Sequence, residues 1–278
     1  SNDIAVFLME KHDVPIVQFI IQINSGTYND PKDKVGLSSF TASLLDEGAG
    51  GLSSLELADE IDYLGANLSS VSNRHSTWIS LNIPKSKLNE GLNLLYSTVV
   101  NPNLDLVELN RLKEKSLTSL FQEKSQPNAI ARRLFKFVLY KDHPIGFSLT
   151  ESSIKNLNIN DIIIYDSDFY RHNNANFFIA GDITESEATK SLESLFLNWE
   201  KSIIPDSKPI EEYHELNGVK IFLVDKPEAA QSIIRIGHFS ESRESPDYFP
   251  ITIMNTILGG SFTSRLNYNL REKNGFTY

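Results

Sequence analysis

The stretch from Gly36 to Gly48, with the sequence GLSSFTASLLDEG, constrains the fold of this chain most strongly. Its apolar residues recur at helical spacing, which predicts a short helix with one buried face. These apolar residues are Leu37, Phe40, Leu44 and Leu45. Gly48 is expected to cap the carboxyl end, because glycine enters the left-handed region without steric cost. The opposite face carries Ser39, Ala42 and Ser43, which are neighbours at positions i, i+3 and i+4.

Composition narrows the class of protein. The chain has 278 residues, of which 40% are hydrophobic, enough for one large domain or two medium ones. The net charge of -10 argues against nucleic acid or an anionic membrane as the main partner. We find no apolar run of about 18 residues, so no membrane-spanning helix is expected. The absence of cysteine excludes disulfides and thiolate metal sites.

The hydrophobic pattern along the chain alternates between strand and helix periods. Strands are expected at 4–9, 14–24, 67–72, 76–83 and 176–181, and helices at 53–65, 86–99, 104–124, 128–140, 159–172 and 184–199. Two helix starts, Ser53 with Glu56 and Thr184 with Glu187, have the capping-box spacing. This mixture predicts an α+β fold with a mostly antiparallel sheet and helices packed on one of its faces.

The pattern of the first residues starts again late in the chain. The segment 219–226 parallels 4–11, and the segment 231–237 parallels 18–24, at nearly the same offset. A helix over 248–258 then takes the place of the first helix. Two aligned segments predict a duplicated domain, so both late segments are expected to be strands.

The domain boundaries follow from this repeat. We expect a first domain over residues 1–205, a linker over 206–217, and the start of a second homologous domain over 218–278. The linker prediction rests on the two prolines and few apolar residues of the stretch 201–217. The second copy would need as many residues as the first, so it is expected to be truncated.

The first helix and its surroundings resemble the inverted zinc-motif helix of the pitrilysin/insulinase peptidases, the M16 family. The shared pattern is Gly-Leu-x-x-Phe-x-x-x-Leu-Leu followed by Gly. In that family the helix carries His-x-x-Glu-His, and these three places fall here on Ser39, Ala42 and Ser43. The resemblance continues through 57–66, 101–102, 143–146, 173–182, 259–266 and 270–275.

The resemblance also implies where the remaining zinc ligand would lie. In the family it is a glutamate in the long helix, and the matching position is Ser119, with Thr118 beside it. Glu114 and Glu123 are nearby, but one helical turn moves a carboxylate by about 5 Å. This displacement is too large for a zinc–oxygen bond, which is about 2.0–2.2 Å long. The three ligands and the general base are therefore missing together. We expect no catalytic residue, metal or cofactor in this chain, with zinc in a partner subunit.

A second family feature is retained. The second half of such proteins carries an Arg and a Tyr, seven residues apart, that hold the substrate backbone near the zinc. Arg271 and Tyr278 have this spacing. A guanidinium and a phenol can donate hydrogen bonds to a peptide carbonyl or to a developing oxyanion. The resemblance implies that both residues bind substrate at a site whose zinc belongs to a partner.

The resemblance implies a non-catalytic subunit of an M16-type zinc metallopeptidase, inactive on its own. It would form a heterodimer with a zinc-motif homologue and close a chamber around peptide substrates. The alternatives are a structural or assembly protein of the same fold, and an active metallopeptidase with a relocated site. The histidines argue against the latter, because none are paired at i, i+3 or i+4; they are His12, His75, His143, His172, His214 and His238. The resemblance favours the bacterial periplasm or envelope, with the cytoplasm as the alternative.

Overall fold

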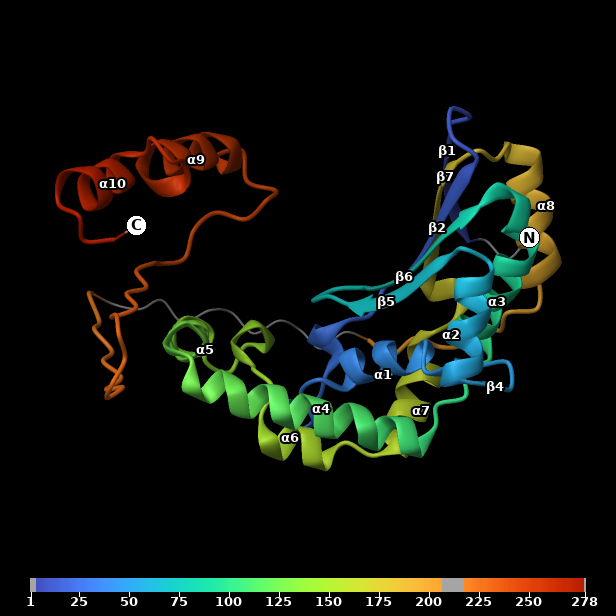
Figure 1. Ribbon diagram of the computed structural model, residues 1–278, viewed down its shortest axis with the longest axis horizontal. Helices are drawn as coiled ribbons and strands as arrows, with labels where there is room; N and C mark the ends of the chain where they lie inside the picture. The colour runs from blue at the N-terminus through green and yellow to red at the C-terminus, as the bar shows by residue number, and fades with distance from the viewer. Residues whose placement is uncertain (1–3, 207–217, 278) are drawn as a thin grey trace. The chain divides into compact units, whose positions relative to one another are not determined.

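The computed structural model describes residues 4–206 and 218–277, which form two compact units divided between Ile234 and Arg235. The strands are β1 (Ala5–Glu10), β2 (Ile16–Ile23), β3 (Gly48–Ala49), β4 (Leu52–Ser53), β5 (Asn67–Ser72), β6 (Thr77–Pro84) and β7 (Ala175–Gly181) (Figure 1). The helices of the same unit are α1 (Leu37–Leu45), α2 (Ser54–Tyr63), α3 (Leu88–Val100), α4 (Leu106–Ser125), α5 (Pro127–Tyr140), α6 (Glu151–Asn156), α7 (Ile159–Phe169) and α8 (Glu185–Phe196).

Short turns connect these elements, and the second unit is helical. The 3-10 turns of the first unit are η1 (Thr27–Asn29), η2 (Lys32–Lys34), η3 (Lys85–Lys87), η4 (Pro144–Gly146) and η5 (His172–Asn174). The second unit contains α9 (Tyr248–Asn255), α10 (Arg265–Asn267) and two π-helical turns, η6 (Thr256–Gly260) and η7 (Tyr268–Lys273). Within the described residues, no helix combines the length and the apolar character needed to cross a membrane.

The central sheet has five strands in the order β1-β7-β2-β6-β5. β7 pairs parallel with β1 and antiparallel with β2, and the other pairs are antiparallel. β7 comes about 150 residues after β2 in the chain, yet it lies between the first two strands. β3 and β4 form a separate two-stranded hairpin.

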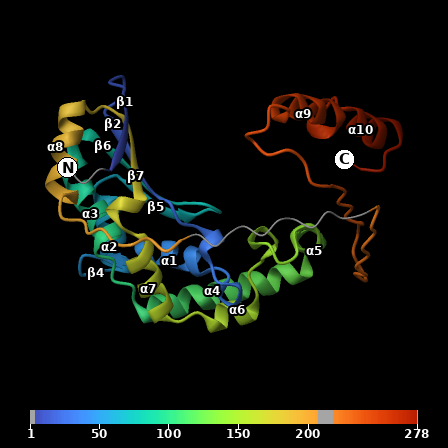
Figure 2. The same cartoon turned by 180° about the vertical axis from the view of Figure 1, so that it is seen from behind.

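One face of the sheet is covered by helices and the other is open, as the two opposite views show (Figures 1 and 2). On β2, Val17, Phe19, Ile21 and Ile23 are buried. The residues between them are exposed or only partly buried. β6 and β7 repeat this alternation, so their inward side chains share one core with α1, α3 and α7. The predicted α+β class, mostly antiparallel with helices on one face, is confirmed.

Helix α1 is held at its amino end by a carboxylate. Asp30 accepts hydrogen bonds from the backbone N–H of Gly36 at 2.7 Å and of Ser38 at 2.8 Å. Gly36 has φ 104°, a left-handed conformation that favours glycine. Burial raises the pKa of Asp30 to about 6, although these hydrogen bonds favour its charged form. The carboxylate therefore satisfies helix donors that would otherwise have no partner inside the core.

The prediction that Gly48 caps α1 is wrong. The helix ends at Leu45, and its cap residue is Asp46, with φ -95°. Gly48 instead starts β3 and pairs with Ser53, at φ 124°. A Cβ there would lie 2.8 Å from the carbonyl oxygen of Leu52, so glycine serves the tight β3–β4 hairpin rather than the helix end.

Most other predicted elements are present with shifts of a few residues at their ends. Both capping boxes form: the backbone N–H of Ser53 donates to Glu56 at 2.8 Å, and that of Thr184 donates to Glu187 at 2.9 Å. The short helix α6 was not predicted from the sequence. It starts at Thr150, whose hydroxyl accepts from the backbone N–H of Ser153 at 3.0 Å.

The two strands predicted at 219–226 and 231–237 are absent from the structure, whereas the helix predicted from residue 248 is formed as α9. The side chains of Val219 and Ile236 are almost fully exposed. No described strand pairs with either segment, and a β-strand needs a neighbour to bond its backbone groups. Most of the predicted linker, 207–217, lies outside the described residues, so the domain boundaries remain predictions.

Replacement of Leu45 by alanine is expected to lower the free energy of unfolding by about 2–5 kcal/mol, because its side chain lies wholly in the core beneath α1. Leu55→Ala on α2 is the matched control, since Leu55 is 79% exposed, and it should change stability by less than about 0.5 kcal/mol. Urea unfolding followed by circular dichroism measures both. Equal losses in the two variants would contradict the described core.

Candidate functional site

The two ligand positions on α1, Ser39 and Ser43, and the general-base position, Ala42, carry no metal-binding side chain, although the helix itself is intact. Ser39 and Ser43 are partly exposed, and Ala42 is 1% exposed. The apolar face formed by Leu37, Phe40, Leu44 and Leu45 is buried as predicted. Ala42 thus places a methyl group inside the packing, at the position where the family has its general base.

Ser119 lies on α4, a helix that packs against α1. Its side chain is exposed, while Leu112 and Leu120 of the same helix are buried. Zinc in proteins is bound by imidazole, carboxylate or thiolate, and the positions on α1 and α4 offer hydroxyls and a methyl group. The residues present do not fit the zinc ion of the family. Over residues 4–206 and 218–277, no three His, Cys, Asp or Glu side chains gather as a metal site.

The carboxylates next to the end of α1 are engaged by neighbouring groups. Glu47 forms an ion pair with Arg111 of α4 and accepts a hydrogen bond from the Ser54 hydroxyl at 2.7 Å. The Nε of Arg111 lies 2.6 Å from Glu108. Burial raises the pKa of Asp46 to about 6, and the neighbouring charge of Glu47 adds to that shift. Glu47 thus links the end of α1 to α4 and to the start of α2.

Arg271 lies in the second unit, on the π-helical turn η7. Its guanidinium carbon is 4.9 Å from the centre of the Phe262 ring, and its Nε is 3.7 Å from Glu272. A cation–π contact uses no N–H donor, so the Nη groups of Arg271 can still donate hydrogen bonds. Tyr278, the other predicted substrate-binding residue, lies outside the described residues.

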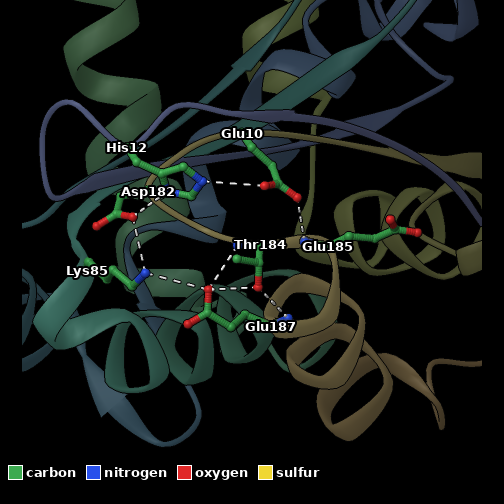
Figure 3. Close-up of polar contacts among 7 residues, drawn as sticks. All are labelled: Glu10, His12, Lys85, Asp182, Thr184, Glu185 and Glu187. Carbon is green, nitrogen blue, oxygen red and sulfur yellow. Dashed lines mark hydrogen bonds and ion pairs between the residues drawn. The ribbon is translucent and has the colours of Figure 1, made fainter.

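A polar network, which the sequence analysis did not identify, joins the ends of three strands (Figure 3). His12 lies in the turn after β1, and its Nδ1 is 2.7 Å from Asp182, which follows β7. The Nζ of Lys85, just after β6, is 3.2 Å from Asp182 and 3.6 Å from Glu187. Glu10 of β1 accepts a hydrogen bond from the first backbone N–H of α8 at 2.9 Å.

The hydrogen bonds of this network favour the charged forms of His12 and Asp182. The hydrogen bond to Asp182 raises the pKa of His12, with a smaller contribution from Glu10. The hydrogen bonds from His12 and Lys85 lower the pKa of Asp182. The network's residues come from the ends of β1, β6 and β7 and from the start of α8, so only the folded sheet brings them together. The network is a surface clamp that links the ends of β1, β6 and β7 to the start of α8, while the backbone ladders set the register of the strands.

A partly buried acid, Asp166, lies on α7, the helix that packs against α1. Burial raises the pKa of Asp166 to about 7, and the positive charge of Arg171 opposes the shift. Its Oδ1 is buried and has no hydrogen-bond partner among the described residues. The folded state therefore favours the protonated form of Asp166.

Comparison with protein-family models decides the family. A model described as "Insulinase (Peptidase family M16)" matches residues 5–152, and one described as "Peptidase M16 inactive domain" matches residues 156–278. This chain belongs to peptidase family M16. The degenerate positions on α1 and α4 therefore lie within an M16 domain, and Arg271 lies within the part that matches the inactive-domain model.

Relatives of similar sequence support this M16 assignment. A Bacillus subtilis protein named "Uncharacterized zinc protease YmxG" is 22% identical over 280 residues, covering 100% of this chain and 67% of the relative. A Helicobacter pylori protein named "Non-peptidase homolog YmxG" is 23% identical over 279 residues, covering 99% of this chain and 63% of the relative. The chain thus spans about two thirds of the length of these relatives.

A solved structure shows the same fold. The crystal structure of a peptidase M16 inactive domain from Pseudomonas fluorescens superposes with a TM-score of 0.84 at 22% identity. The match covers 100% of this chain and 68% of that structure. At this identity the likeness establishes the M16 fold.

Asp166→Asn is expected to remove a pH-dependent loss of stability. Because the pKa of Asp166 is raised from 3.8 to about 7 on folding, the parent protein loses stability as the pH rises from about 4 to 7. The variant should match the parent near pH 4 and exceed it above pH 7, by on the order of 3 kcal/mol. Urea unfolding at several pH values measures this difference.

Asp59→Asn, at an exposed position of α2, is the matched control and should follow the parent at every pH. An Asp166→Asn variant whose stability difference from the parent is the same at pH 4 and pH 8 would contradict the raised pKa.

Proposed function

We propose that this chain is a non-catalytic subunit of an M16-type zinc metallopeptidase, which supplies Arg271 and Tyr278 to a site whose zinc ligands belong to a partner. The carrying observation is the intact helix α1, whose apolar face is buried, with Ser39 and Ser43 at the ligand positions and Ala42 at the general-base position. The name of the Helicobacter pylori relative, a non-peptidase homologue, supports the same role.

The contacts that hold α1 in place do not require a metal ion. Its core face, its Asp30 cap and the Glu47–Arg111 ion pair all involve residues other than the ligand positions. Loss of the ligands therefore leaves the fold and its inner surface intact. A subunit of this kind can still enclose a peptide, even though hydrolysis depends on the residues of its partner.

Arg271 suits the binding of a peptide backbone. Phe262 contacts the guanidinium, and the Nη groups can donate hydrogen bonds to a peptide carbonyl. This chain would bind and orient the peptide, while the partner would supply the general base and the ligands that hold the zinc. The heterodimer, the peptide substrate and a location in the bacterial periplasm or envelope remain predictions from the family resemblance.

The full-length protein, alone and mixed with a zinc-motif homologue from the same genome, provides the test. Metal analysis and peptide hydrolysis should show neither bound zinc nor activity for this protein alone, and activity in the mixture. Stoichiometric zinc and chelator-sensitive hydrolysis by this protein alone would overturn the proposal. Activity of the homologue that is unchanged by this protein would instead favour a structural or assembly role.

Arg271→Ala should lower kcat/KM of the mixture by about 100-fold, as expected when a donor to the reacting carbonyl is removed. Arg243→Ala is the matched control. The guanidinium of Arg243 also stacks on aromatic rings of the second unit, at 4.4 Å from Tyr248 and 4.7 Å from Phe249. The control should keep activity within about twofold of the parent. An equal loss in both variants would show that the effect is structural.

Phe262→Leu should raise KM about two- to fivefold with little change in kcat, because it removes a cation–π contact of about 0.5–1 kcal/mol that positions Arg271. Phe262→Tyr keeps an aromatic face and should restore KM. Steady-state kinetics of the two variants in the mixture measure this difference. A Tyr variant as impaired as the Leu variant would contradict the positioning role.

A further inference from the structure

Four cationic side chains lie close enough to interact electrostatically in the first unit, in a chain whose net charge is -10. Arg74 lies at the tip of the β5–β6 hairpin, and Arg132, Arg133 and Lys136 lie on α5. We call these four residues the cationic cluster. Arg74 and Arg132 are exposed, and Arg133 and Lys136 are partly buried.

The α5 members of the cationic cluster are held by backbone carbonyls. An Nη of Arg133 donates to the carbonyl of Leu149 at 2.6 Å, and the Nζ of Lys136 donates to the carbonyl of Phe147 at 2.5 Å. Both carbonyls belong to the segment that follows η4. The side chains of Arg133 and Lys136 are therefore held in place without a ligand, which reduces the conformational entropy that they lose on binding one.

The hairpin tip that carries Arg74 is tied to the same region. The backbone N–H of Tyr28 donates to the carbonyl of Arg74 at 3.0 Å. The Tyr28 ring contacts His75 edge-on at 4.4 Å and His143 at 5.8 Å. His143 caps η4, and η4 packs against α5. A continuous set of contacts thus fixes Arg74 near Lys136.

Acidic side chains compensate only part of this charge. Glu123 of α4 pairs with Arg132 at 3.1 Å and with Arg133 at 3.5 Å. Within the described residues, neither Arg74 nor Lys136 forms an ion pair with a carboxylate. Burial lowers the pKa of Lys136, and the like charges of Arg74, Arg133 and Arg132 lower it further. Like charges that repel one another are stabilised when an anion binds between them.

We propose that the cationic cluster binds the carboxylate side chains of an acidic peptide segment. The guanidinium fork of arginine matches the two oxygens of a carboxylate, and the ordered Lys136 adds a point charge. This inference deepens the proposed function by naming the class of peptide, and it rests on that function only for the peptide being a substrate. Binding itself needs neither a partner nor a metal.

An acidic peptide fits the cationic cluster better than a nucleic acid does. Nucleic-acid binding typically draws on about six to ten phosphate contacts along an extended basic surface. The cluster offers four cations, one carboxylate already neutralises part of their charge, and the rest of the chain is acidic. A short segment with a few carboxylates can bind the cluster, and because it is short it is repelled little by the acidic remainder of the protein.

Fluorescence anisotropy of a labelled peptide rich in Glu and Asp, titrated with the full-length protein at low salt, tests the proposal. A peptide with Gln and Asn at the same positions is the ligand control. The acidic peptide should bind and should be released by added salt. Arg74→Gln and Lys136→Gln should each weaken binding about tenfold, and Lys136→Arg should retain it.

Lys87→Gln is the matched protein control. Lys87 lies on η3 and pairs with Glu90 at 3.4 Å, so the substitution removes the same charge at a different place. It should change affinity by less than about twofold. Thermal unfolding of all variants confirms that they are folded.

Several outcomes would overturn the inference. These are no binding of the acidic peptide at low salt, equal binding of the Gln/Asn peptide, and an equal loss in Lys87→Gln. Tighter binding of a single-stranded oligonucleotide through Arg74 and Lys136 would also overturn it, since it would identify the ligand as a nucleic acid. The binding assay involves no zinc and no partner, so its failure is distinguishable from failure of the proposed function.

Discussion

The position of β7 between β1 and β2 is the constraint on which the rest of the first unit depends. It joins residues 175–181 to the first strands of the chain through two ladders of hydrogen bonds. The chain between β6 and β7 must therefore return to the sheet, and its helices cover the buried face on the way. Those helices stabilise the sheet because β2, β6 and β7 turn their apolar residues toward them. At one end of the sheet, Asp182 after β7 contacts His12 after β1 and Lys85 after β6 (Figure 3).

Helix α1 shows that packing and metal binding can be separated in this fold. Leu44 and Leu45 are buried, and Asp30 satisfies the first backbone donors of the helix. These interactions lie on the sides of the helix away from Ser39 and Ser43. In small metal-dependent domains, metal binding supplies much of the folding free energy. In this domain a large apolar core supplies it, so the ligand positions could become serine and alanine without loss of the helix.

The chain has a negative net charge, yet one part of its surface carries a cluster of positive charges. An acidic protein places four cations together because Tyr28 contacts both the β5–β6 turn and His143, which caps η4, and η4 packs against α5. One carboxylate, Glu123, balances only part of their charge. The tertiary structure also changes the charge of two acids, Asp30 and Asp166. Burial raises the pKa of Asp30 to about 6 and of Asp166 to about 7, so their charge depends on the tertiary structure rather than on composition.

The sequence by itself determined the local elements and the chemistry that is missing. Periods of 2 and 3.6 residues located the strands and helices, and the spacings of Ser53 with Glu56 and Thr184 with Glu187 located two helix starts, because these signals act over a few residues. The residue types at Ser39, Ala42, Ser43 and Ser119 are also plain from the sequence once the resemblance aligns them.

Only the tertiary structure decided the features that depend on residues distant in the chain. It brought Asp30 to the backbone donors at the amino end of α1 and placed Gly48 in a hairpin, because both depend on how loops fold back. It also brought Arg74 to Lys136 and His12 to Asp182. The apolar segments 219–226 and 231–237 have strand-like patterns but no described partner strand, so they form no strand. A period specifies which face of a segment is apolar, whereas a β-ladder, a clamp or a charge cluster exists only when a second segment supplies the other half.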